Sequence, residues 1–211
     1  SLRYTLFFMI TPNNLPKLLL ASHSKRRQQL LMQIQVDFEL LSLPDHLDIE
    51  INNIKADAEF PCDYALRLAT EKNHQARKHC PGHHFILTAD TVVALGNVIL
   101  GKPKSLPDAQ NILSCLSGKT HEVITAVVVS TPQKELKSCI GKTAVTFNHL
   151  TKDEIDRYLT VNNVMDKAGS YAIQEYAALF ISHISGSYSN VVGLPLFETG
   201  QLLKTLGILA V

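Results

Sequence analysis

A single acidic residue stands inside an apolar run near the middle of the chain. In the segment ILTADTVV, Asp90 lies between two pairs of aliphatic residues, in a run that otherwise has the composition of a buried strand. Burying a carboxylate costs free energy unless the group is paired or bound to a cation. Asp90 is therefore a candidate to bind Mg²⁺ or to accept a proton from water. The alternative is that Asp90 only caps a neighbouring turn.

A loop of small residues followed by two arginines forms a second candidate site. The segment ASHSKRR comes after the apolar run LLL, with Ser24 at the end of the loop and Arg26 and Arg27 at the start of an expected helix. Backbone N–H groups at a helix start, the helix dipole and guanidinium groups all favour phosphate oxygens. Basic residues in a first turn oppose the dipole, a small cost that phosphate binding would explain. The alternative is a solvated helix face.

Three further polar residues stand in segments that can hold or read a ligand. In ILGKP, Gly101 allows close backbone approach and Lys102 projects a compact cation. Lys72 lies on an expected amphipathic helix, and Gln174 offers both a donor and an acceptor, as reading a nucleobase edge requires. Each also has an ordinary interpretation, as a turn residue, a surface charge or a surface amide.

The segment KHCPGHH contains a cluster of histidine and cysteine side chains. His79, Cys80, His83 and His84 have a spacing loosely similar to that of a metal site. A structural zinc site needs four ligands in closed tetrahedral geometry, and the sequence offers no matching second pair of ligands. We therefore expect an exposed, histidine-rich turn here.

Composition favours one compact α/β unit. The chain has 211 residues, of which 45% are apolar, enough to bury a substantial core. Its formal charge of +1 comes from 20 basic and 19 acidic residues, without the basic excess of a protein that binds nucleic-acid backbones. The cysteines are far apart and no secretory signal precedes them, so we expect reduced thiols in a cytoplasmic protein. They are Cys62, Cys80, Cys115 and Cys139.

The first ten residues, SLRYTLFFMI, are apolar but too short to span a bilayer. We expect no membrane association. Met9 lies just before the first recognisable element and is the expected natural start, which makes residues 1–8 an expected extension. Residues 9–211 are then expected to form a single domain.

Strand and helix patterns alternate along the chain. Strands are expected over 16–22, 38–43, 120–131 and 141–150, with a hairpin over 84–102 that turns at Gly96-Asn97. Helices are expected over 24–34, 63–79, 108–118, 151–160 and 194–207. The segments 166–174 and 184–195, rich in Gly, Ser and Tyr, have the composition of binding loops. This order predicts a mixed α/β sheet covered by helices, with ligands at the carboxyl ends of strands.

Seven ordered segments resemble the Maf family, also called septum-formation-inhibitor-like proteins. They are LLASHSKRRQQLL, YALRLATEK, ADTVV, ILGKP, LSGKTHEVITAV, DKAGSYAIQ and GSYSNVVGLPL, and they extend from about Leu18 to Leu206. The resemblance implies a nucleoside triphosphate pyrophosphatase with the α/β fold of inosine triphosphate pyrophosphatases, a mixed twisted sheet flanked by helices with a cleft between two lobes. It also implies a homodimer that uses Mg²⁺ or Mn²⁺.

The resemblance assigns roles to the candidate residues. Asp90 matches the catalytic acid of the family, described as the proton acceptor. Arg27, Lys72 and Lys102 match its phosphate-side cations, and Ser24 belongs to the loop that precedes them. These positions imply water attack at the α-phosphorus, with pyrophosphate as the leaving group.

Three positions separate the branches of the family. Arg26, Thr91 and Gln174 agree with the branch that acts on dTTP and UTP rather than on 7-methyl-GTP. The stretch LPDHLDIEINN is longer than its counterpart in the family, so either Asp48 or Glu50 matches the second metal ligand. Two alternatives stay open at this point: hydrolysis of modified pyrimidine nucleotides, and a non-enzymatic regulator of cell division.

Overall fold

One mixed sheet forms the centre of the molecule. The computed structural model describes residues 17–44, 59–80 and 82–210. Within these ranges the strands form a seven-stranded sheet of order β2-β1-β3-β5-β6-β7, with β4 paired to β3. The pairs that β1 makes with β2 and β3 are parallel, and the other pairs are antiparallel. The strands are β1 (Leu18–Leu20), β2 (Phe38–Leu40), β3 (Phe85–Leu95), β4 (Val98–Leu100), β5 (Thr120–Ser130), β6 (Leu136–Phe147) and β7 (Ile181–Gly186).

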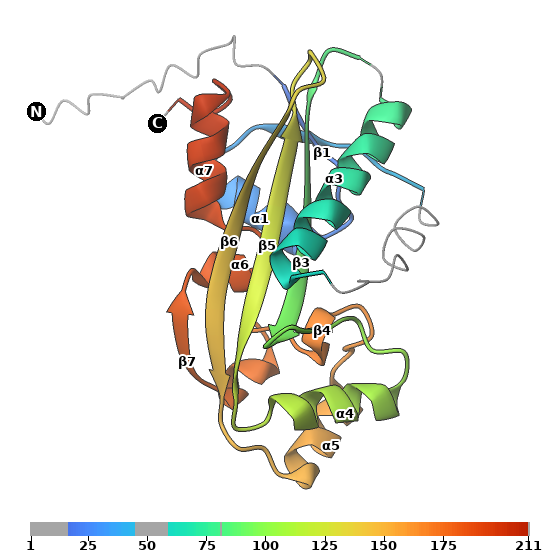
Figure 1. The fold of residues 1–211 in the computed structure, drawn as a ribbon, viewed down its shortest axis with the longest axis vertical. Coiled ribbons are helices and arrows are strands. Elements are labelled where there is room, and N and C mark those ends of the chain that lie inside the picture. Colours follow the sequence, from blue (N-terminus) through green and yellow to red (C-terminus); the bar gives the residue numbers. More distant parts are fainter. Residues whose placement is uncertain (1–16, 45–58, 81, 211) are drawn as a thin grey trace, which may run out of the picture.

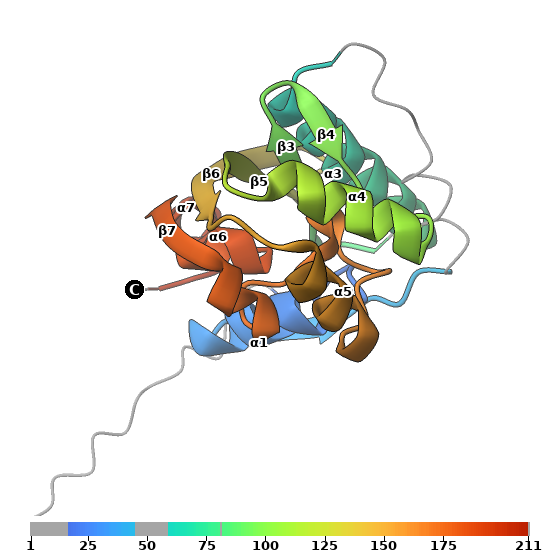
Figure 2. The ribbon, with the colours of Figure 1, turned by 90° about the horizontal axis from the view of Figure 1, so that it is seen from below.

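Helices cover both faces of the long strands. Figure 2 shows α3 and α1 on opposite sides of β5 and β6, and Figure 1 shows α4 and α5 gathered at one end of the sheet. The helices are α1 (Lys25–Gln33), α3 (Pro61–His79), α4 (Leu106–Leu116), α5 (Lys152–Val161), α6 (Tyr188–Val192) and α7 (Leu196–Thr205), and short 3-10 helices are η1 (Ala168–Ser170) and η2 (Tyr176–Phe180). This architecture confirms the predicted mixed sheet flanked by helices.

Local sequence signals account for the ends of several elements. Helix α3 begins at Pro61, whose fixed φ and missing N–H suit a first helical position. Thr151 and Glu154 cap α5 with a reciprocal capping box, which confirms the expected cap. Gly96 has φ +60° in the β3–β4 turn, a conformation that glycine adopts without strain.

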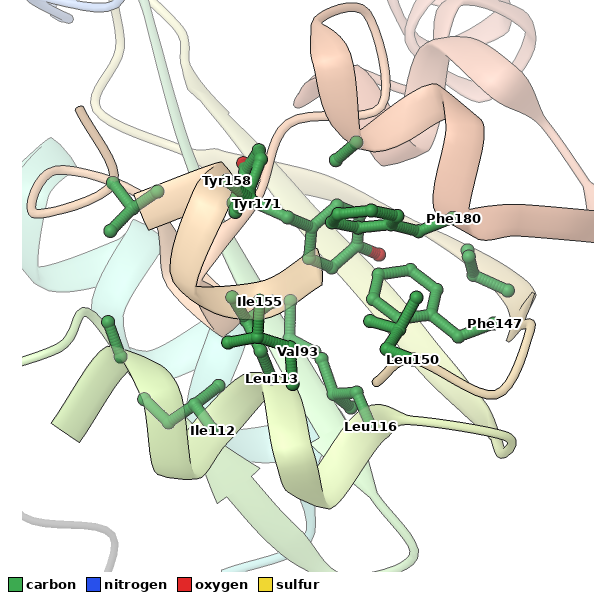
Figure 3. Close-up of a cluster of buried hydrophobic side chains, with 14 of the residues drawn as sticks. Val93, Ile112, Leu113, Leu116, Phe147, Leu150, Ile155, Tyr158, Tyr171 and Phe180 are labelled. Carbon is green, nitrogen blue, oxygen red and sulfur yellow. The ribbon is translucent and has the colours of Figure 1, made fainter. Parts of the chain in front are cut away.

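Two apolar clusters lie along one face of β3 and β5. Leu87 and Ala89 belong to the first cluster, which packs against α1 and α7, and Val93 belongs to the second, which packs against α4 and α5. Figure 3 shows the second cluster, with Val93 near the aromatic rings of Phe147 and Phe180. The boundary between these two cores is where the predicted cleft between lobes would lie.

The edge of β3 opposite β5 is paired only at its two ends. β3 pairs with β1 over residues 85–87 and with β4 over residues 93–95, while β5 occupies its other edge. Among the described residues, 88–92 therefore have no strand partner on the side of β1 and β4. We call this stretch the open edge of β3, and Asp90 and Thr91 lie within it.

The structure corrects one expectation and extends two others. Segment 184–195, predicted as a binding loop, instead ends β7 and forms α6, and Asn190 in it is fully buried. The loop prediction failed because β7 pairs with β6 and the Asn190 side chain is buried against β5 and β6. The helix expected from residue 108 begins at Leu106, and the strand expected from residue 141 begins at Leu136.

In the described part of the chain, no helix has the length and apolar character needed to cross a membrane.

Candidate active site

Asp90 forms a buried ion pair with Lys72. The Lys72 Nζ donates to Asp90 Oδ1 at 2.7 Å, and each side chain is only 10% exposed. Lys72 lies on the face of α3 that packs against the sheet, and Asp90 pairs in register with Ala126 of β5. A buried carboxylate needs such a partner. The structure thus brings together two residues that the sequence singled out separately.

The start of α3 adds an aromatic ring and a further cation near this pair. Burial and the charge of Asp90 raise the pKa of Tyr64. The Arg67 guanidinium lies 5.3 Å from the centre of the Tyr64 ring and bonds Glu59 through two nitrogens, at 2.8 and 2.6 Å. Tyr64 was not among the candidate residues of the sequence.

Arg27 is held by three polar groups on the opposite face of the sheet. Its Nε donates to Gly193 O at 2.9 Å, its Nη2 to Thr91 Oγ1 at 3.1 Å and its Nη1 to Ser22 Oγ at 3.4 Å. Ser24 is the N-cap of α1, and its Oγ accepts a bond from Arg27 N at 3.4 Å. Ser24 thus has a local structural role here, and its predicted contact with a ligand stays a prediction.

The open edge of β3 relates these two groups of residues. Successive side chains of a strand point to opposite faces, so Asp90 faces α3 while Thr91 faces α1. The loop after β1, which leads to Arg27, approaches this edge from one end, since Ala21 N donates to Leu87 O at 2.9 Å. The end of β4 approaches from the other, because Leu100 pairs with Val93. Phosphates at this edge could contact both faces.

Lys102 and Gln174 come from segments that meet beyond β4. Gly169 N donates to Gly101 O at 3.1 Å, which joins the loop of Lys102 to the segment of Gln174. Gly169 has φ +70°, and a Cβ there would contact the Val93 side chain at 3.0 Å. Both Lys102 and Gln174 are exposed, so their predicted roles as substrate contacts stay predictions.

A buried histidine anchors the segment that carries Gln174. His121 Nε2 and Tyr171 Oη are 2.7 Å apart, and both residues are buried. Burial lowers the pKa of His121 to about 4 and raises that of Tyr171. A neutral imidazole therefore holds the side chain of Tyr171, three residues before Gln174. Sequence reasoning missed this pair, because His121 looked like any polar residue of a strand.

Arg26 lies in the first turn of α1, next to Arg27. It is half-buried, and its Nε is buried without a hydrogen-bond partner in the described part of the chain. Partial burial raises the pKa of Asp166, but the hydrogen bond from Lys167 and the charges of Lys167 and Arg26 outweigh it, so the pKa lies below its ordinary value. Arg26 of α1 is therefore near enough to influence an acid of the segment before η1.

Asp90 is the one buried carboxylate among the described residues. Mg²⁺ is commonly held by one or two carboxylates together with substrate phosphates, and the hard oxygen donors of Asp90 fit that chemistry. The other predicted ligand, Asp48 or Glu50, lies outside the described residues. Within the described ranges no cluster of three or more His, Cys, Asp or Glu side chains is placed to hold a metal.

Comparison with known proteins defines the class to which this fold and site belong. The family model for Maf-like proteins matches residues 17–206. The chain therefore belongs to the Maf-like family, and the resemblance noted in the sequence is confirmed.

Relatives from several bacteria are similar over most of their length. A protein of Nitrosospira multiformis named dTTP/UTP pyrophosphatase is 44% identical over 198 residues, covering 91% of this chain and 95% of the relative. One of Pasteurella multocida with the same name is 42% identical, with 90% and 95% covered. One of Haemophilus ducreyi, named nucleoside triphosphate pyrophosphatase, is 43% identical, with 91% and 96% covered. Among solved structures, a HAM1 protein from Coxiella burnetii is 13% identical with a TM-score of 0.48, covering 90% of this chain and 99% of that one.

Proposed function

We propose that this chain is a nucleoside triphosphate pyrophosphatase that hydrolyses dTTP and UTP to the monophosphate and pyrophosphate. The observation that carries this proposal is the buried Lys72–Asp90 pair at the open edge of β3, beside Arg27 held on Thr91. Relatives named dTTP/UTP pyrophosphatase at 42–44% identity support the same activity.

Asp90 is the general base of the proposed reaction. It accepts a proton from the water that attacks the α-phosphorus, and Lys72, 2.7 Å away, offsets the negative charge of the carboxylate before the proton arrives. Arg27 and Lys102 stabilise the charge that grows on the leaving pyrophosphate as the bond to the α-phosphorus breaks. The burial of Asp90 limits screening by bulk water and strengthens these interactions.

A divalent cation, Mg²⁺ or Mn²⁺, completes the site. Asp90 would hold it together with Asp48 or Glu50 and the phosphates of the substrate. The cation supplies charge neutralisation and Lewis acidity at the phosphoryl oxygens. Removal of divalent ions by a chelator should abolish turnover, and added Mg²⁺ or Mn²⁺ should restore it.

Base selection rests on Arg26, Thr91 and Gln174. Gln174 is exposed beside the anchored segment that follows η1, where its amide can pair with a pyrimidine edge. Arg26 and Thr91 act from the side of α1. A site that pairs polar groups with the correct base discriminates well, because a wrong base leaves those groups without hydrogen bonds.

The protein would act on free nucleotides as a cytoplasmic homodimer. The near balance of 20 basic and 19 acidic residues supports a small-molecule substrate rather than a nucleic acid or a membrane surface. Light scattering combined with size-exclusion chromatography should give the mass of two chains.

Product analysis tests the proposed activity. The protein is incubated with dTTP, UTP, CTP, GTP and 7-methyl-GTP and either Mg²⁺ or Mn²⁺, and nucleotides and pyrophosphate are quantified. We expect dTMP or UMP with equimolar pyrophosphate, at the highest kcat/KM for dTTP and UTP. Release of orthophosphate and a diphosphate, or no release from any triphosphate, would contradict the proposal, and the second result would favour a regulator.

A further inference from the structure

A chain of hydrogen bonds runs from Arg27 across the sheet to α6. Arg27 Nη2 donates to Thr91 Oγ1 at 3.1 Å, and Thr91 Oγ1 is 2.8 Å from Thr125 Oγ1. Thr125 Oγ1 in turn donates to the backbone carbonyl of Asn190 at 3.1 Å. Thr125 and Asn190 are fully buried. They belong to segments far from α1 in sequence, and neither was among the candidate site residues.

The number of hydroxyl protons fixes which group donates and which accepts along this chain of hydrogen bonds. A hydroxyl has one proton to donate, and Thr125 gives its own to Asn190 O. Thr91 must then donate to Thr125 across the 2.8 Å contact. The lone pairs of Thr91 are consequently left to accept from Arg27. A hydroxyl that donates becomes a better acceptor, so successive bonds in one direction strengthen each other, including the bond from Arg27 to Thr91.

Asn190 is itself locked in a single orientation. Its Nδ2 donates to Val123 O at 2.9 Å and to Thr143 Oγ1 at 3.0 Å, and Thr143 Oγ1 donates to Ser187 O at 2.9 Å. A flipped amide would place its oxygen against two acceptors. The backbone of α6, which begins after Ser187, is thereby held against β5 and β6.

Glycine at position 141 makes room for this amide. Thr91, Thr125 and Gly141 pair in register across β3, β5 and β6. A Cβ at Gly141 would lie 2.6 Å from Asn190 Oδ1 and 2.5 Å from a side-chain atom of Pro195. At the boundary of the two cores, the three paired positions are therefore Thr91, Thr125 and Gly141. The side chain of Asn190 fills the space beside Gly141.

The end of α6 also accepts a hydrogen bond from Arg27. Gly193 ends α6 with φ +132°, and its carbonyl accepts from Arg27 Nε at 2.9 Å. Asn190, in α6, thus helps to fix two of the three acceptors of Arg27, Thr91 through Thr125 and Gly193 through the helix end. Two bonded nitrogens define the plane of the guanidinium group.

We propose that Thr125 and Asn190 are positioning residues that orient Arg27 toward the phosphates of the substrate, without touching the substrate themselves. This inference rests on the proposed function, because it assigns the effect of the hydrogen-bond chain to the same reaction. A misplaced guanidinium stabilises the leaving pyrophosphate poorly, since a displacement of about 1 Å is enough to lose much of the catalytic effect.

Thr125→Val is the variant that tests the chain. Asn190→Asp is the more obvious change but would bury a carboxylate against two acceptors and could prevent folding. Valine keeps the shape of Thr125 and removes only its hydroxyl. We expect kcat/KM for dTTP to fall about tenfold, as for the loss of one hydrogen bond to a positioned group, with the loss divided between kcat and KM.

The double variant separates positioning from a general structural effect. Arg27→Ala should lower kcat/KM about 10²-fold, and Thr125→Val in the Arg27→Ala background should lower it no further than about twofold. Thr131→Val is the matched control: Thr131 is also buried, at the far end of β5, and its Oγ1 accepts from Glu135 N at 3.2 Å. It should change kcat/KM by less than about twofold.

A binding measurement separates this inference from the proposed function. Affinity for a non-hydrolysable dTTP analogue is measured by calorimetry for the same four variants and the wild type. Weaker binding by Thr125→Val that disappears in the Arg27→Ala background supports positioning even if the wild type releases no pyrophosphate. Equal losses in both backgrounds, or a loss as large in Thr131→Val, overturn the inference while leaving the activity intact. A wild type that neither hydrolyses nor binds overturns both proposals.

Discussion

Asp90 and Thr91 are neighbours on β3, yet their side chains bind partners on opposite faces of the sheet. Asp90 accepts from Lys72 of α3, and Thr91 accepts from Arg27 of α1. Because the described residues leave this stretch of β3 unpaired on one side, a triphosphate at that edge can meet the base from one face and the arginine from the other. This arrangement explains how two adjacent residues can serve two parts of one substrate.

Asp90→Asn should abolish turnover in a protein that still folds, although Lys72 then lies buried without its counter-charge and the free energy of unfolding falls. The amide oxygen can still accept the hydrogen bond from Lys72, but the amide neither takes a proton from water nor adds charge to a cation. We expect kcat to fall about 10²–10⁴-fold, as for the loss of a general base, with a circular dichroism spectrum like that of the wild type. Near-normal turnover in the Asn variant would mean that Asp90 is only structural.

Lys72→Met should destabilise the fold by leaving the Asp90 carboxylate buried without its cation. Removing one partner of a buried pair costs about 3–5 kcal/mol, measured as the free energy of unfolding in urea. The double variant Lys72→Met with Asp90→Asn should recover most of that loss, because the unpaired charge is gone. A single variant within about 1 kcal/mol of the wild type would show that the pair contributes no more than a surface ion pair.

The stability of the protein should fall as pH decreases through the range set by His121. Burial lowers the pKa of His121 from 6.5 to about 4, so between these values the unfolded chain binds a proton that the native state does not. The contribution of neutral His121 to the free energy of unfolding is complete above the unfolded pKa. It decreases by roughly 3 kcal/mol in total as the pH falls to 4. Urea unfolding at pH 7 and pH 5 measures it.

His121→Gln is the control for this pH dependence. Glutamine can still bond the Tyr171 hydroxyl but does not titrate. Its free energy of unfolding should therefore change less between pH 7 and pH 5 than that of the wild type, by about 2 kcal/mol. Identical pH dependence in the two proteins would mean that burial does not lower the pKa of His121 in the native state.

Gln174→Ala should erode base preference more than phosphate affinity. Gln174 is exposed in the free protein, but a bound base would cover it, and a covered polar group left unpaired by a wrong base costs about 1–3 kcal/mol. The variant removes that discrimination. The preference of kcat/KM for dTTP and UTP over GTP should shrink in Gln174→Ala. Lys102→Ala is the matched control, because phosphate contacts carry no base information, so kcat/KM should fall for all substrates alike. An unchanged ranking in Gln174→Ala would remove Gln174 from base recognition.

The elements and most candidate residues could be predicted because their signals are local. Apolar periodicity located the strands and helices, and an acid in an apolar run indicated that Asp90 needs a partner. That this partner is Lys72 depends on how α3 packs on the sheet, which no local pattern specifies. Alternation along β3 places Asp90 and Thr91 on opposite faces, and the open edge follows only from the registers of β1 and β4.

Asn190 shows where local reasoning failed. The residues before it are Ser, Gly and Tyr, a composition typical of an exposed loop, and nothing in the sequence indicates that Asn190 is fully buried. The space that it fills exists because residue 141 on another strand is glycine. Burial of this kind depends on a pairing between distant segments, so it becomes visible only in the folded structure.

Hydrolysis of dTTP in ¹⁸O-labelled water tests the central claim most directly. If Asp90 directs water to the α-phosphorus, the label enters the phosphate of dTMP and none enters pyrophosphate, as mass spectrometry of both products after a single turnover would show. Label in pyrophosphate instead would place the attack at the β-phosphorus. That result would contradict the proposed geometry of Asp90, Lys72 and Arg27 around the substrate.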